Sequence, residues 1–185
     1  ALAARAAAMA QPELHVIGEI MGAHDFPLPS LLCKFAFEAG GNFRMLQGIA
    51  SGQTHCDTPP EGEVANLSHP IDVHYAVKGI DGWPRLRLEV YGVDQYGRVE
   101  LAGYGCCMVP TAAGTHELRC TTWRPCGSMR EQLRTFFLGG TPRLKHKEVI
   151  ASSSDRFRLQ TEPAGDVLLR LSVLPKDLAK FGVLC

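Results

Sequence analysis

The amino-acid sequence predicts an all-β domain, an antiparallel β-sandwich of about eight strands. Two observations carry this prediction. Apolar and polar residues alternate along several short segments, and turn sequences rich in Gly and Pro separate them. Alternation puts every second side chain on one face of a strand, and many short strands at this spacing are typical of sandwiches. With 185 residues, 45% of them hydrophobic, the chain can form one domain with a sizeable core.

Five segments alternate most regularly and give the clearest strand predictions. They are 14–20, 33–37, 71–77, 86–90 and 167–173. Weaker patterns predict further strands at 43–48, 53–57, 99–109, 116–121 and 156–161. Turn sequences between them include Gly40-Gly41 and Asp81-Gly82, since Gly and Asp adopt backbone angles that other residues resist.

One amphipathic helix is expected at 128–138, from Ser128 to Leu138. Ser128 and Glu131 form a capping box, in which each side chain satisfies the other's backbone N–H. The apolar stripe then comprises Met129, Leu133, Phe136 and Phe137. This stripe could cover the sandwich or bind a partner helix, and packing against its own domain is the more frequent arrangement. A second, short helix is predicted at 176–181.

The chain is predicted to contain a single domain, 11–185, preceded by a flexible extension, 1–10. The extension is Ala-rich with one Arg, and it is too short and too weakly apolar for a signal peptide. Seven cysteines at irregular positions do not suggest a secreted disulfide framework. We therefore expect a cytoplasmic location and mostly buried free thiols.

Charge and motifs argue against several classes of function. Nineteen Lys and Arg residues balance nineteen Asp and Glu residues, so no nucleic-acid partner is expected. The sequence has no GxSxG, HExxH or phosphate-binding loop motif, and no enzyme activity or cofactor is expected. Asp72 and His74 share a strand face and could form an acid–base pair, but that face is the polar one, where solvated charges are normal.

No metal site is expected from the cysteines and histidines. Cys56, His69 and His74 are close in sequence, yet they lack the paired-ligand spacing of zinc sites. Arg143, Lys145 and Lys147 form a basic segment that could contact phosphoinositide headgroups, each charge contributing about 1 kcal/mol near an anionic surface. The other reading, which we prefer, is a solvated loop, since Glu148 follows immediately.

Several motifs occur in the same order as in the B9 domain, a divergent relative of the C2 β-sandwich. They are Gly82-Trp83-Pro84-Arg85-Leu86, Asp94-Gln95-Tyr96-Gly97-Arg98, Leu101-Ala102-Gly103-Tyr104-Gly105, Thr122-Trp123-Arg124-Pro125 and the ending Phe181-Gly182-Val183-Leu184-Cys185. The chain resembles that family from Met9 to Cys185. The resemblance implies a C2-like sandwich, and Gly92, standing where a calcium-binding C2 domain would have an Asp, implies that calcium docking is lost.

The resemblance also implies a location and partners. Members of the B9 family belong to the tectonic-like (Meckel syndrome) complex at the ciliary transition zone and basal body. There they support ciliogenesis and the diffusion barrier between the ciliary and plasma membranes. A non-catalytic scaffold subunit is therefore expected, with the two other B9-domain proteins as partners and a further link to gamma-tubulin. The alternative is a peripheral, calcium-independent module that binds membrane phosphoinositides.

Candidate interface anchors lie in the Trp-Pro-Arg motif and the Asp-Gln-Tyr-Gly-Arg motif. They are Trp83, Pro84, Arg85, Tyr96 and Arg98. Trp and Arg beside rigid turns bury large areas at little cost in rotamer freedom. A core position is an equal alternative for Trp83, and Trp123 is expected in the core. An unpaired edge strand that pairs with another B9 domain is a further expectation.

Overall fold

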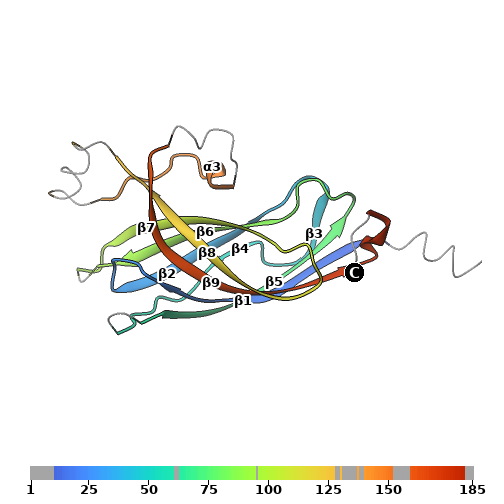
Figure 1. Cartoon of the computed structure of the whole chain (residues 1–185), viewed down its shortest axis with the longest axis horizontal. Helices are drawn as coiled ribbons and strands as arrows, with labels where there is room; N and C mark the ends of the chain where they lie inside the picture. The colour runs from blue at the N-terminus through green and yellow to red at the C-terminus, as the bar shows by residue number, and fades with distance from the viewer. Residues whose placement is uncertain are drawn as a thin grey trace, which may run out of the picture.

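The computed structural model describes residues 11–60, 63–94, 96–127, 130, 137, 140–151 and 159–181. Within them, nine strands form one antiparallel sheet in the order β3-β5-β1-β9-β8-β7-β6-β2-β4. The sheet curls, as Figure 1 shows, and the rings of Phe35 on β2 and His69 on β5 lie 5.2 Å apart although these strands are distant in sheet order. The all-β antiparallel prediction is confirmed, with nine strands in one curled sheet.

The strands are long for a small domain. Their bounds are β1 (Glu13–His24), β2 (Ser30–Glu38), β3 (Phe43–Gly48), β4 (Ser51–Gln53), β5 (Ala65–Val77), β6 (Arg85–Val93), β7 (Val99–Met108), β8 (Gly114–Pro125) and β9 (Thr161–Lys176). All five regularly alternating segments lie inside strands, and 43–48 is β3. The pattern at 116–121 falls in β8, and that at 99–109 falls in β7 except for Val109, which follows the strand.

The strand expected at 53–57 is wrong for most of its length, because β4 ends at Gln53. The cause is the next residue, Thr54, which is buried and whose Oγ1 accepts the backbone N–H of Cys33 at 3.0 Å. The Thr54 side chain thus accepts a hydrogen bond from Cys33 of β2 that a backbone carbonyl would accept in a regular sheet. Further along, Asp57 pairs with Leu31 in an isolated bridge. Of 156–161, the structure describes only the end, where Thr161 begins β9.

The predicted helix at 128–138 lies outside the described residues, apart from Arg130 and Phe137, which are both helical. The short C-terminal helix is present as a 3₁₀ turn, η2 (Leu178–Phe181). One further helical turn, α3 (Glu148–Ala151), was not expected. Residues 1–10 also lie outside the described part. No helix among the described residues has the length and apolar character that a membrane crossing requires.

Two apolar clusters hold the curled sheet together. The larger fills its interior with alternate residues of the long strands, such as Val16, Leu88 and Leu169. The smaller lies on the outer face of β2, β6, β7 and β8, and it contains Leu32, Tyr91, Leu101, Tyr104, Trp123 and Ile150. Ile150 comes from α3, which contacts β6 and β7 and lies above the sheet in Figure 1. The outer face is therefore covered where α3 crosses it.

Candidate functional site

Trp83 and Pro84 are buried, so the domain itself uses these two candidate anchors. The indole Nε1 of Trp83 donates to the carbonyl of Val109 at 2.8 Å, and its ring meets Phe43 edge-on at 5.6 Å. A buried, hydrogen-bonded indole fixes the turn before β6. The core reading of Trp83 is the one the geometry favours, and Trp123 is buried as expected.

Arg85 is exposed, but its guanidinium is already engaged. Its Nη1 donates to the carbonyl of Ala151 at the end of α3. Beside it lies an open hollow of about 520 Å³ lined by Glu38, Ala39, Gly40, Gly82, Trp83, Arg85, Glu148 and Ala151. Arg85 thus ties α3 to the start of β6 through one of the five N–H donors of its guanidinium.

Tyr96 and Arg98 form the exposed tip between β6 and β7. Asp94 organises this tip, since its Oδ1 accepts the backbone N–H groups of both Tyr96 and Arg98 at 2.8 Å. Its Oδ2 also pairs with Nε of Arg98 at 2.9 Å, and the Arg98 guanidinium lies 5.1 Å from the centre of the Tyr96 ring. The tip is preformed and presents an aromatic ring beside a cation, and Tyr and Arg are residue types enriched among interface hot spots.

The basic segment is exposed, but two of its three basic residues have partners on the domain. Lys147 Nζ lies 2.8 Å from Oε2 of Glu89, and Arg143 donates to the carbonyl of Val99 at 3.1 Å. The Arg143 guanidinium also lies 5.8 Å from the ring centre of Tyr91. Lys145 is exposed. Two of the three predicted lipid ligands therefore have partners within the chain.

Glu89 is the buried charge around which this region is organised. It accepts hydrogen bonds from Lys147 and from the Tyr91 hydroxyl, each at 2.8 Å, and Arg87 Nε lies 3.8 Å away. Burial, and then the hydrogen bond to Glu89, raises the pKa of Tyr91 to about 12. The tyrosine is therefore a neutral donor at any physiological pH. Arg87, Glu89 and Tyr91 are alternate residues of β6, and the sequence missed the cluster because Lys147 comes from a distant segment.

An exposed apolar patch, which we call the corner patch, comprises Met45, Leu46 and Ile49. These side chains are 44%, 44% and 69% exposed. The β3–β5 register shifts between Met45 and Gln47, and this bulge turns two successive residues of an edge strand outward. The sequence does not reveal this patch, because alternation would have put one of the two inside. A bulge also hinders pairing of β3 with another strand, so contact through side chains is favoured over edge pairing.

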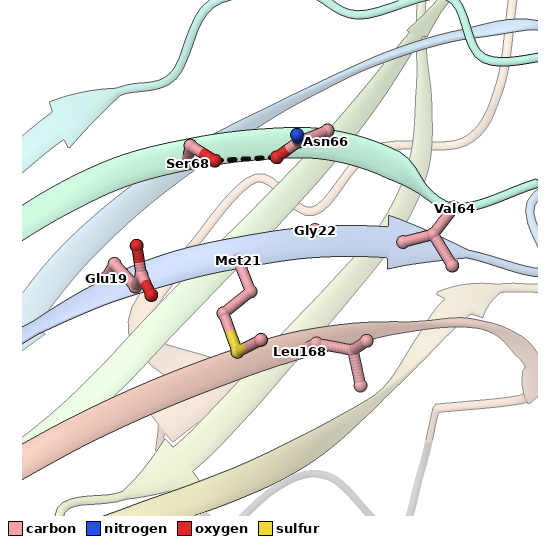
Figure 2. A pocket seen from close by; sticks show the side chains of 7 residues that line it. All are labelled: Glu19, Met21, Gly22, Val64, Asn66, Ser68 and Leu168. Carbon is pink, nitrogen blue, oxygen red and sulfur yellow. Dashed lines mark hydrogen bonds between the residues drawn. The ribbon is translucent and has the colours of Figure 1, made fainter.

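A shallow pocket of about 340 Å³ lies on the outer face of β1, β5 and β9 (Figure 2). Its lining residues are Glu19, Met21, Gly22, Val64, Asn66, Ser68 and Leu168. A bulge in β1 between Ile20 and Gly22 creates it. Met21, Val64 and Leu168 supply apolar walls, while Glu19 is tied to Arg170 at 3.1 Å. This lining is better suited to binding an apolar side chain than to catalysing a reaction.

Asp72 and His74 are not brought together as an acid–base pair. Asp72 Oδ1 lies 2.7 Å from Nε2 of His15, and His74 Nε2 lies 3.4 Å from Glu13. The two imidazoles stack at 4.9 Å between centroids. These are cross-strand pairs of a solvated face, as the polar side of the alternation indicates.

The sequence relatives of the chain decide its family. The sequence profile of a family described as "Ciliary basal body-associated, B9 protein" matches residues 14–174. The chain belongs to the B9 family. Its B9 sequence is 51% identical to B9 domain-containing protein 2 of Bos taurus and 49% identical to that of Homo sapiens, each over 94% of this chain and 99% of the relative. The Drosophila melanogaster protein of the same name is 34% identical over 92% of this chain and 97% of the relative.

Among solved structures, this B9 chain is similar to a C2 domain of plant Extended Synaptotagmin 1. The TM-score is 0.40 and the identity 13%, over 89% of this chain and 95% of that one. The expected membership of the B9 family is confirmed by the sequence relatives.

Proposed function

We propose that this B9 chain is a non-catalytic scaffold subunit at the base of the cilium, where it binds the two other B9-domain proteins within the tectonic-like complex. In that complex it supports ciliogenesis and the diffusion barrier between the ciliary and plasma membranes. The observation that carries the proposal is similarity along nearly the whole length of the B9 relatives, including 99% of the bovine protein. Since the family profile spans residues 14–174, we expect the surface of this domain to carry the function.

Two surfaces support a binding role. The corner patch exposes Met45, Leu46 and Ile49 at one edge of the sheet, and clustered exposed apolar side chains are typical of partner contacts. The tip between β6 and β7 exposes Tyr96 and Arg98, residue types enriched among interface hot spots. We propose the corner patch as the main contact, since its three apolar side chains are exposed to solvent. The tip is proposed as a second contact.

Binding titrations with purified B9-domain partners test this assignment. Ile49→Glu should weaken binding by about tenfold or more, because it puts a charge into an apolar contact. Met108→Glu is the matched control, since Met108 is also exposed but lies at the end of β7. Equal affinity of the Ile49 variant and the wild type would rule out the corner patch. Tyr96→Ala reports separately on the tip.

Phosphoinositide binding is the second candidate, supported only by the basic residues Arg143, Lys145 and Lys147. Flotation with vesicles that contain phosphatidylinositol bisphosphate tests it. Lys145→Ala is the decisive variant, because Lys147 and Arg143 are engaged with Glu89 and Val99. Binding that survives this change places lipid contact elsewhere. Gamma-tubulin is tested in the same titrations as the B9 partners.

A further inference from the structure

A histidine and two aspartates meet where β1 ends and β9 begins. His24 is the last residue of β1, Asp25 follows it, and Asp166 of β9 pairs directly with His24 in the β1–β9 register. One imidazole nitrogen and one oxygen from each carboxylate all lie within 4.8 Å of one another. Nδ1 of His24 and Oδ2 of Asp25 are 2.7 Å apart.

An independent observation concerns the second oxygen of Asp166. This side chain is only 10% exposed, and its Oδ1 is buried without a hydrogen-bond partner among the described residues. The other oxygen accepts hydrogen bonds from Nε and Nη2 of Arg119. A buried carboxylate oxygen without a donor is unfavourable, and a cation beside it would remove that cost. Arg119 holds the carboxylate in place and Thr121 also interacts with it, while Oδ1 has no hydrogen bond among the described residues.

We propose that His24, Asp25 and Asp166 bind one divalent first-row transition-metal ion of the zinc or manganese kind. Imidazole and carboxylate are the donors these ions accept, whereas calcium takes six to eight oxygen ligands. Bonds of about 2.0–2.2 Å place neighbouring ligand atoms about 3.3 Å apart around a tetrahedral ion. The 2.7 Å pair must open slightly, and rotation of the exposed Asp25 side chain can do this while Arg119 keeps Asp166 in place.

The site would tie the β1–β2 connection to β9. Gly165, next to Asp166, already approaches this connection closely, since a Cβ there would lie 2.2 Å from the carbonyl oxygen of His24. Phe26 packs against the main core from the same connection. A bound ion would therefore stabilise the folded chain and order this end of the sheet.

The test uses the full chain, titrated calorimetrically with zinc chloride. We expect one zinc ion to bind and His24→Ala and Asp25→Asn each to weaken that binding by about tenfold or more. His116→Ala and Asp81→Asn are the matched controls, and they should bind zinc as the wild type does. Asp25 is 72% exposed, so its variant is expected to fold. Unchanged zinc affinity in both the His24 and the Asp25 variants would overturn the proposal.

Manganese gives a second readout that thiol groups do not compete for. In amide NMR spectra, paramagnetic broadening should centre on residues 24–26 and 165–167, and it should disappear in Asp25→Asn. Broadening centred elsewhere, or calcium binding at these residues more tightly than zinc, would contradict the assignment.

Discussion

The ammonium group of Lys147 lies 2.8 Å from Oε2 of Glu89, a carboxylate on β6 that is only 5% exposed. The two residues are 58 positions apart. Their ion pair fastens the segment before α3 to the outer face of the sheet, next to the apolar cluster that contains Ile150. Lys147, which the sequence places in a basic segment that could contact a membrane, therefore has a structural role in the domain.

Replacing Lys147 with Ala should destabilise the domain. Glu89 would keep the hydrogen bond from Tyr91 but lose its nearest cation, and a buried carboxylate without a counter-charge is costly. Because the lysine side chain is 46% exposed, we expect a loss of about 1–2 kcal/mol in the free energy of unfolding, measured in urea. Lys145→Ala is the control, with a change within about 0.5 kcal/mol. Equal effects of the two variants would contradict the structural role of Lys147.

Trp83→Phe separates a core role from an interface role. The change removes the donor to the carbonyl of Val109 and leaves that oxygen unsatisfied, so stability should fall by about 1–3 kcal/mol. Thermal unfolding monitored by circular dichroism measures this. Affinity for a B9 partner should be unchanged in the folded variant. A variant that keeps full stability but loses binding would restore Trp83 as an interface anchor.

The tip between β6 and β7 should loosen in acid. The hydrogen bond from the Arg98 backbone, aided by that from Tyr96, lowers the pKa of Asp94 below its ordinary value of 3.8. A depressed pKa in the folded state means that the ionised carboxylate stabilises the turn. That stabilisation is present above the ordinary value and is lost as the pH falls through the lower, folded-state value. Amide shifts of Tyr96 and Arg98 should therefore titrate together with a midpoint below 3.8, and a midpoint above it would refute this account.

Gly92 is required by packing. A Cβ at this position would lie 2.1 Å from Cδ1 and 2.4 Å from Cβ of Leu28. Gly92→Ala should therefore displace Leu28 and lower stability by about 1–3 kcal/mol. Gly41→Ala is the control, because a Cβ at Gly41 meets nothing within 4 Å. The unfolding temperatures of the two variants test this. A Gly92 variant as stable as the Gly41 variant would show that Leu28 can move aside at no cost in stability.

The sequence predicts the strands well because the alternation of inward and outward side chains is local. Val16 and Leu169 could be placed inside from their own segments. The partner of Lys147 could not be found in this way, since it depends on how a distant segment crosses β6. The exposure of both Met45 and Leu46 could not be predicted from the sequence either, because a bulge breaks the alternation of side chains there. Trp83 was open between core and interface, since burial depends on which strands surround it.

Size-exclusion chromatography of this chain mixed with the two other B9-domain proteins tests the central claim most directly. At micromolar concentration, the scaffold account predicts one peak that contains all three proteins, and Ile49→Glu should remove this chain from it. Three separate peaks, with each protein folded by circular dichroism, would contradict the claim that this B9 chain acts by binding its relatives.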